Sequence, residues 1–472
     1  MLQQFMIVLP ELMITLLAMA SQMVAVFCRQ SIKWVTHTTV VLAVVIIFFT
    51  IKLSANELIA FNNSFVLNPT VGLFKAFVLG FTIAAILLYK NTCKISAESI
   101  KMEFITLMLL STVGIFISIS SRNFLLLFCG LELQALSGYA LAAFNSSDPK
   151  SSEAGLKYFV LGALVTCLML FGISFLYGFS GGLQYNVTLE MLNSNLKPSI
   201  GAIIGATLML SGIFFKLSAA PMHIWTPDVY EGAPTAAVTY FATAQKIGIL
   251  VVLLNILTFV IGDYFQISID LVRIIAMLSM IIGALGAIMQ SSLKRLMAYS
   301  TVLNIGYVLI GVVLHSEQGN FAALLYLLIY ITGVLGFFAC LIALLGEKTD
   351  SANFEDIRGI GYSKKAIAGA IAIIMFSMIG LPPLAGFFGK YYVFYQAIVK
   401  EEFLLAFTGI FTSVIAAFYY LKVIKSMYFT EPIIELEYIP TSGSLLFITC
   451  LVIGFILFFS LFPLDYVIPL IS

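Results

Sequence analysis

Apolar segments of about twenty residues follow one another along the whole chain, and they restrict what it can fold into. A helix of this length crosses the roughly 30 Å hydrocarbon core of a bilayer. Hydrophobic residues make up 61% of the chain and charged residues 10%, whereas a soluble domain carries about 25% charged residues. The pattern predicts an integral membrane protein whose functional partners include the lipid bilayer.

The predicted fold is an all-α polytopic membrane protein with fourteen spans, because the segments are apolar on every face and lack the alternation of barrel strands. The predicted spans are 5–27, 35–53, 70–90, 102–120, 124–143, 153–178, 199–224, 233–262, 269–290, 296–315, 319–346, 366–398, 403–429 and 444–463. The first span has no basic leader or small-residue cleavage site, so we expect a retained helix. No connection is long enough to fold alone, and residues 1–472 are expected to form a single membrane domain.

The basic residues at the connections predict an orientation. Fourteen lysines and arginines lie in the odd-numbered connections and five in the even-numbered ones. Cytoplasmic connections carry the excess of basic residues. We therefore expect the odd connections to be cytoplasmic and both termini to lie on the other side.

The remaining composition excludes several kinds of site. The six cysteines are scattered without a CxxC pair, and the three histidines are far apart, so neither predicts a metal or iron–sulfur site. No glycine-rich phosphate loop follows a strand. A net charge of +1 indicates no nucleic-acid partner.

Charged residues lie deep in predicted spans at Glu132, Lys216, Lys246 and Lys390. A charge at the centre of a spanning helix costs about 2.5–3.5 kcal/mol on insertion scales, so such residues usually face the protein interior and have a function. For Glu132 the alternative is an ion pair that only fixes helix packing. For the lysines it is snorkelling, which the long apolar flanks on both sides disfavour.

Two of these lysines lie beside residues that interrupt a helix. Pro221 follows Lys216, and Gly380, Pro382 and Pro383 precede Lys390. Interrupted helices in membranes line cavities and ion sites, and corresponding pairs of them indicate inverted repeats. The sequence GIFFK, ending at Lys216, loosely resembles GFFGK, ending at Lys390.

Lysine is informative because burial lowers its pKa from about 10.4 toward the range in which it exchanges protons, while a nearby carboxylate has the opposite effect. The residues therefore predict proton transfer along buried groups. Lys157 and His223 are further candidates. Lys157 is equally compatible with a snorkelling residue at a helix end, and His223 with an interfacial packing residue.

Three stretches carry a family resemblance. FKLSAAPMHIWTPDVYEGAPTAAVTYFATAQKIG at 215–248, KRLMAYSTVLNIGY at 294–307 and GLPPLAGFFGKYYVF at 380–394 resemble the antiporter-like membrane subunits of respiratory complex I, the bacterial NADH–quinone oxidoreductase. The resemblance covers nearly the whole chain. Some members of this family carry glutamate at the position of Lys390, and one has a long C-terminal lateral helix that is lacking here. These two differences leave one member that the chain resembles most.

The resemblance implies two inverted five-helix repeats, at 102–262 and 269–429, each with a broken helix. It implies a proton path in which Glu132 pairs with Lys216, Lys246 is the central lysine and Lys390 is the last. The remaining matched positions are Lys157 and His223. One position departs from the pattern, because Asn304 stands where a histidine is often found, and an amide does not titrate.

The function implied is proton translocation by a subunit of an NADH–quinone oxidoreductase in the bacterial inner membrane, next to other membrane-arm subunits. No cofactor is expected in this chain, and NADH, FMN, iron–sulfur clusters and quinone are expected on partner subunits. Two alternatives stay open: a subunit of a multisubunit cation/proton antiporter, and a structural spacer whose charges are packing pairs.

Overall fold

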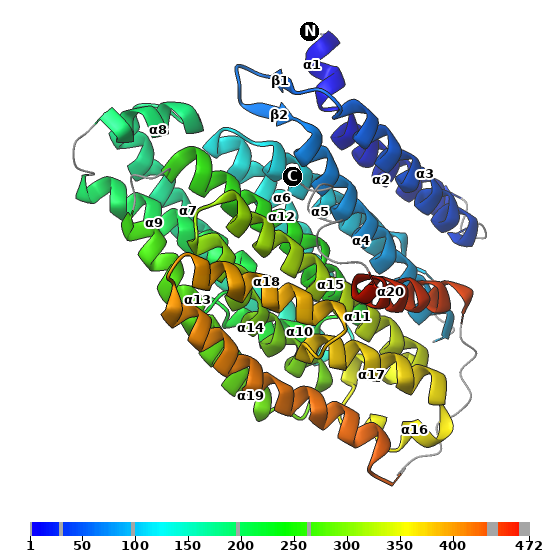
Figure 1. Ribbon diagram of the computed structural model, residues 1–472. Helices are drawn as coiled ribbons and strands as arrows, with labels where there is room; N and C mark the ends of the chain where they lie inside the picture. Colours follow the sequence, from blue (N-terminus) through cyan, green and yellow to red (C-terminus); the bar gives the residue numbers. More distant parts are fainter. Residues whose placement is uncertain are drawn as a thin grey trace. The chain divides into compact units, whose positions relative to one another are not determined.

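The computed structural model describes residues 2–27, 32–95, 100–194, 199–261, 266–431 and 442–461, and these are almost entirely helical (Figure 1). The α-helices are α1 Leu2–Ile7, α2 Leu9–Phe27, α3 Ile32–Leu53, α4 Pro69–Ile95, α5 Met102–Ser120, α6 Phe124–Ala142, α7 Pro149–Ser180, α8 Tyr185–Ser194, α9 Ile200–Leu217, α10 Trp225–Gly232, α11 Thr235–Ala242, α12 Ala244–Ile256, α13 Gln266–Ile288, α14 Leu293–Val313, α15 Glu317–Leu345, α16 Ile360–Ser363, α17 Lys365–Ile379, α18 Ala385–Val399, α19 Phe403–Tyr428 and α20 Gly443–Leu461. A π-helical turn, Leu257–Ile261, extends α12, and the 3-10 segments are Gly346–Ser351 and Glu355–Ile357. The prediction of an all-α membrane fold is confirmed.

Twelve helices within the described residues are long and apolar enough to cross a membrane. They correspond to twelve of the predicted spans. Of the other two, 366–398 is divided between α17 and α18. The described part of 444–463 lies on α20, whose apolar stretch Gly443–Phe459 is shorter, and residues 462 and 463 lie outside the described residues. The count of fourteen therefore stays a prediction.

The chain divides into two compact units. The first contains Met1–Ile86, Ser99–Leu217 and Ala236–Ser268, and the second contains Leu87–Glu98, Ser218–Thr235 and Ile269–Ser472. Both units are interleaved along the sequence, because the chain leaves the first at the end of α9 and returns to it at α11.

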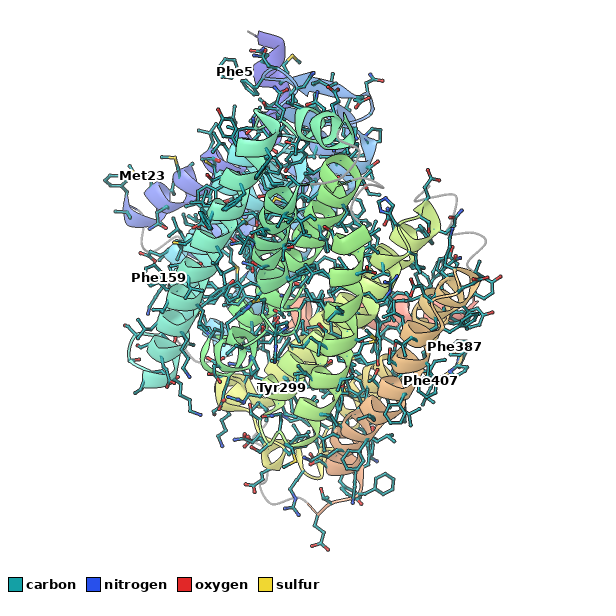
Figure 2. The ribbon with its side chains drawn as sticks, turned by 90° about the vertical axis from the view of Figure 1, so that its left-hand side faces the viewer. Phe5, Met23, Phe159, Tyr299, Phe387 and Phe407 are labelled. Carbon is teal, nitrogen blue, oxygen red and sulfur yellow. The ribbon has the colours of Figure 1, made fainter. Side chains whose placement is uncertain are left out.

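In the first unit, α5 packs against α2, α6 and α12, and α9 packs against α7 and α12. Lys246 lies on α12, 1% exposed, so this helix is interior to the unit. The outer helices carry apolar side chains that point away from the protein. Met23 on α2 and Phe159 on α7, labelled in Figure 2, are 57% and 50% exposed, as expected of residues that face lipid.

In the second unit, α15 is the central helix, in contact with α14, α17, α18 and α20. Buried residues make up 94% of the apolar window of α14 and 89% of that of α15, against 39% for α19. Polar side chains on α14 and α15 are therefore kept from lipid by protein on all sides.

Both predicted helix interruptions are present. The first interruption follows Lys216. Helix α9 ends at Leu217, whereas the predicted span continues to residue 224, and a turn leads to α10. The second lies between α17 and α18, where Gly380 adopts the left-handed conformation, with φ +88°, that closes many helices. A third interruption, at Thr243 between α11 and α12, was not predicted.

A short β-hairpin, which was not predicted, lies in the connection between α3 and α4. Strand β1 Leu58–Ala60 pairs antiparallel with β2 Phe65–Leu67, with Ile59 opposite Val66. Asn62 and Asn63 at the turn have positive φ, which asparagine tolerates better than most residues. The sequence signal was this asparagine pair between two short apolar runs.

Candidate functional site

Lys216 lies in the last turn of α9, where it contacts α6. Its Nζ donates a hydrogen bond of 3.2 Å to the backbone carbonyl of Leu131, the residue before Glu132. The Glu132 carboxylate accepts a hydrogen bond of 2.8 Å from Thr166 Oγ1 on α7. The structure brings Glu132 and Lys216 to the same place, but no ion pair within 4.0 Å joins them among those described.

Lys246 follows the interruption at Thr243, and its Nζ donates to the carbonyl oxygen of Lys216 at 2.9 Å. That carbonyl lacks its helical partner, because α9 ends at Leu217. In a continuous helix the acceptor would receive the amide of Ala220, which donates instead to Ser279 Oγ at 2.8 Å. The broken helix therefore supplies the acceptor that holds the second lysine.

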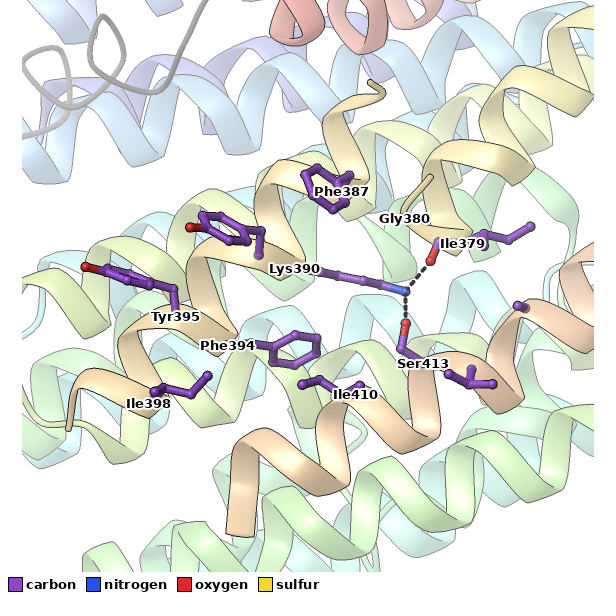
Figure 3. A pocket seen from close by; sticks show the side chains of 12 residues that line it. Ile379, Gly380, Phe387, Lys390, Phe394, Tyr395, Ile398, Ile410 and Ser413 are labelled. Carbon is purple, nitrogen blue, oxygen red and sulfur yellow. Dashed lines mark hydrogen bonds between the residues drawn. The ribbon is translucent and has the colours of Figure 1, made fainter. Parts of the chain in front are cut away.

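Lys390 is held in a similar way in the second unit (Figure 3). Its Nζ donates to the carbonyl oxygen of Ile379 at 3.0 Å and to Ser413 Oγ at 2.9 Å, and it lies 5.4 Å from the centre of the Tyr307 ring. The helical donor for the Ile379 carbonyl would be the amide of residue 383, which is a proline and has no N–H. In each unit, a lysine thus donates to a carbonyl that an interrupted helix leaves without its usual donor.

A cavity of about 460 Å³ reaches Lys390 between α18 and α19 (Figure 3). Its lining is mainly apolar and includes Phe387, Tyr391, Phe394, Ile410 and Val414. Although the Lys390 side chain is only 6% exposed, it lies at the boundary of a space that opens out of the helix bundle.

The other two predicted site residues are less enclosed. Lys157 on α7 is 41% exposed at its side chain and forms an ion pair of 2.7 Å with Glu153, one turn earlier on the same helix. His223 lies in the turn after α9, half-buried, with its ring centre 6.3 Å from that of Tyr299. Its Nδ1 is buried and has no hydrogen-bond partner among the described protein atoms.

Sequence reasoning did not single out an ion-pair cluster around α10 in the second unit. Arg295 Nη1 donates to Asp228 Oδ1 at 2.7 Å and to Glu231 Oε2 at 2.9 Å. Lys294 Nζ donates to the carbonyl of Ala233 at 2.6 Å. The signal was present as two acids one turn apart in WTPDVYEG and a neighbouring Lys–Arg pair.

A buried ion pair in the first unit was also missed. Lys75 on α4 donates to Glu11 on α2, and both side chains are almost completely buried. The Lys75 ammonium also lies 5.1 Å from the Phe65 ring centre and 5.5 Å from that of Phe116. The signal was a charge inside each of two predicted spans. Within the described residues, no group of three histidine, cysteine or acidic side chains is arranged to hold a metal ion.

The comparisons with known proteins identify the family. Residues 121–416 match the family described as NADH:quinone oxidoreductase/Mrp antiporter, TM. This match covers more than half of the chain, which therefore belongs to that family.

Two relatives narrow the resemblance. The chain is 58% identical over 452 residues to NADH-quinone oxidoreductase subunit N of Rickettsia bellii, covering 95% of this chain and 98% of the relative. It is 37% identical over 462 residues to the subunit N of Paramagnetospirillum magneticum, covering 97% and 94%. The expected resemblance to one particular member, subunit N, is confirmed.

Two solved structures share the fold. The first is respiratory complex I from Thermus thermophilus with bound aureothin, in which a chain matches with a TM-score of 0.80 and 26% identity, over 96% of this chain and 97% of that one. The second is the Mrp complex from Dietzia, with a TM-score of 0.75 and 21% identity, over 94% and 82%. The Mrp likeness concerns the fold alone.

Proposed function

We propose that this chain is a proton-translocating membrane subunit of an NADH–quinone oxidoreductase. The observation that carries the proposal is the near-full-length similarity to subunit N. It is supported by one buried lysine in each unit, Lys246 and Lys390, whose ammonium donates to a carbonyl that a helix interruption leaves without its helical donor. The chain contributes to an enzyme complex as a translocase and carries no redox step itself.

In the first unit, Lys216 exchanges between two environments. A change in a neighbouring subunit shifts Lys216 relative to Glu132, whose carboxylate Thr166 keeps in place. When the separation grows, the ammonium loses the attraction of the carboxylate and releases a proton toward Lys246. Lys246 already contacts the Lys216 backbone, so the donor and acceptor groups lie on linked elements.

The carbonyl partner suits a group that changes charge. A protonated lysine donates through an ammonium, and a neutral amine still has N–H donors and gains a lone pair. The Lys216 carbonyl therefore holds Lys246 in either protonation state. The Ile379 carbonyl does the same for Lys390, which releases the proton to the non-cytoplasmic side in our proposal.

The remaining assignments follow from the same proposal. Segments 102–262 and 269–429 form two inverted repeats, Lys157 and His223 supply further proton-transfer positions, and both termini face the non-cytoplasmic side of the bacterial inner membrane. Other membrane-arm subunits adjoin the chain. NADH, FMN, iron–sulfur clusters and quinone bind to partner subunits.

A cation/proton antiporter subunit is the second candidate, because the description of the matching family also names the Mrp antiporter. Such an assembly would depend on a Na⁺ or K⁺ gradient and contain no redox centres. A structural spacer is the third, and it predicts full proton translocation after each lysine is neutralised.

The test begins with the assembly that contains the chain. The tagged chain is purified from its native host in mild detergent and assayed for flavin, iron–sulfur clusters and NADH-dependent quinone reduction. We expect all three. A stable assembly without redox centres, active only with a cation gradient, would establish the antiporter instead.

A second step tests the lysines. In proteoliposomes, Lys246→Ala should abolish most proton translocation while the complex assembles normally, and Lys400→Ala, at an exposed position, should leave it unchanged. Full translocation by the Lys246→Ala complex would refute the role of this lysine and favour the spacer.

A further inference from the structure

A cluster of hydroxyl groups surrounds Asn304 in the second unit. Asn304 and Ser300 lie on α14, Tyr326 and Tyr330 on α15, and Tyr420 on α19. All five are buried, and Tyr420 is completely inaccessible. Polar groups in this position require hydrogen-bond partners, because lipid and apolar side chains offer none.

The hydroxyl groups form a continuous hydrogen-bonded series. Tyr330 OH lies 3.2 Å from Ser300 Oγ, and Ser300 Oγ lies 2.6 Å from Tyr420 OH. Thr301 Oγ1 lies 3.0 Å from Tyr330 OH and is a second hydrogen-bond partner of that hydroxyl, outside the series itself. Each hydroxyl has one proton to donate and two lone pairs to accept with, so the series can pass a proton from one member to the next.

Asn304 fixes the direction of these bonds. Its Oδ1 accepts from Tyr326 OH, and its Nδ2 donates to the Ser300 carbonyl at 2.7 Å. The same Nδ2 lies 3.3 Å from both Ser300 Oγ and Tyr420 OH. An amide nitrogen has two N–H groups and does not accept. One N–H donates to the Ser300 carbonyl, and the other faces Ser300 Oγ and Tyr420 OH, so the protons of these two hydroxyls point elsewhere along the series.

A small cavity joins the cluster to Lys390. Its volume is about 10 Å³, and Asn304, Tyr326, Tyr330, Ser377 and Lys390 are among its lining residues. This is about the smallest space that admits one water molecule. The lining also offers the polar partners that a buried water requires.

We propose that Tyr330, Ser300 and Tyr420 form a proton wire that exchanges protons with Lys390 through one water molecule, and that Asn304 is the residue that positions it. This inference rests on the proposed function. In one transfer, an N–H bond of the Lys390 ammonium breaks, the water gains that proton and passes one of its own to Tyr330. Tyr330 then gives its proton to Ser300, Ser300 gives its proton to Tyr420, and Tyr420 gives its own proton to a second water molecule, which carries it away. Each hydroxyl oxygen of the wire therefore gains one proton as it loses one.

The proposal explains how a residue without a titrating side chain serves at this position. Asn304 stands where the family resemblance leads one to expect a histidine, which can hold the proton itself. Here the transfer occurs through neighbouring hydroxyls, and no member of the wire must hold a charge for long in a low-dielectric interior. Asn304 acts by aligning Ser300 and Tyr420.

Tyr330→Phe tests the wire, because it removes one hydroxyl and keeps the ring. We expect the assembled complex in proteoliposomes to translocate protons at least about a hundredfold more slowly, because a positioned proton-transfer group contributes about 10²–10⁴-fold to a rate. The ratio of rates in H₂O and D₂O should rise, because proton transfer becomes limiting. A defect of packing alone would leave this ratio unchanged. If Tyr330→Phe does not assemble, Ser300→Ala removes the next hydroxyl with a smaller change of volume.

Two controls separate the outcomes. Tyr362→Phe removes the hydroxyl of an exposed tyrosine on α16 and should have no effect. Asn304→Leu should slow translocation, and Asn304→His should restore it. Normal rates and isotope ratios for Tyr330→Phe and Ser300→Ala, while Lys390→Met is inactive, would overturn the wire and leave the proposed function in place. Normal translocation by Lys390→Met as well would overturn the role of Lys390 in the proposed function.

Discussion

The ammonium of Lys246 donates a hydrogen bond of 2.9 Å to the backbone carbonyl of Lys216, so one buried lysine is held by the main chain of another. The contact exists because α9 stops at Leu217 and leaves this carbonyl without its helical donor. Lys390 repeats the relationship with the carbonyl of Ile379. The interruptions thus provide acceptors that carry no charge of their own.

Ser413 supplies the second hydrogen bond to Lys390, at 2.9 Å. We expect Ser413→Ala to slow proton translocation by about tenfold or more, because a hydrogen bond to a charged group contributes about 1.5–3 kcal/mol. Ser413→Thr keeps the hydroxyl and should restore most of the rate. The measurement is proton uptake by proteoliposomes at equal amounts of assembled complex. Equal rates for Ser413→Ala and the unaltered protein would show that this bond has no role.

Both side chains of the Glu11–Lys75 ion pair are buried, so replacing one of them leaves the charge of the other uncompensated. Glu11→Leu or Lys75→Met alone should destabilise the first unit by about 3–5 kcal/mol, whereas the double replacement should be close to neutral. Thermal denaturation of the purified assembly measures the difference. Additive effects of the two single changes would contradict a direct pairing.

Arg295 should hold α10 against α14 through its bonds to Asp228 and Glu231. Arg295→Met removes both and should increase hydrogen–deuterium exchange of the amides of residues 225–232. All three side chains are partly exposed, so we expect a local effect of about 1–2 kcal/mol. Lys348→Ala, at an exposed position, is the matched control. Exchange that stays at the unaltered level in Arg295→Met would argue against the restraint.

Gly386 allows α18 to approach the end of α17. A Cβ at this position would lie 1.7 Å from the carbonyl oxygen of Ser377, which belongs to the backbone and cannot move aside cheaply. Gly386→Ala should therefore disturb the interruption before Lys390 and reduce the yield of assembled complex severalfold. Gly369→Ala on α17 meets no atom within 4 Å and should be tolerated. Equal yields from the two variants would show that the close approach is not required.

Several features of the site required more than the sequence. The sequence predicted buried charges at Glu132, Lys216, Lys246 and Lys390. A charged residue within a long apolar segment can be recognised without knowing how the helix packs. It could not predict that Lys246 and Lys390 bond to carbonyl groups, because every residue has a carbonyl and only the fold decides which one lacks a donor. The Asn304 cluster was missed for a similar reason, since its hydroxyl-bearing residues come from separate helices.

The sequence by itself determined the membrane class, the all-α fold and the positions of the two predicted helix interruptions. These follow from local properties: apolar length, and the absence of an N–H on Pro221 and Pro383. Tertiary structure decided the β-hairpin, the interruption at Thr243 and the partners of each buried polar group. Those depend on which helices pack together, because a buried donor takes the nearest acceptor that packing presents, whatever its distance along the chain.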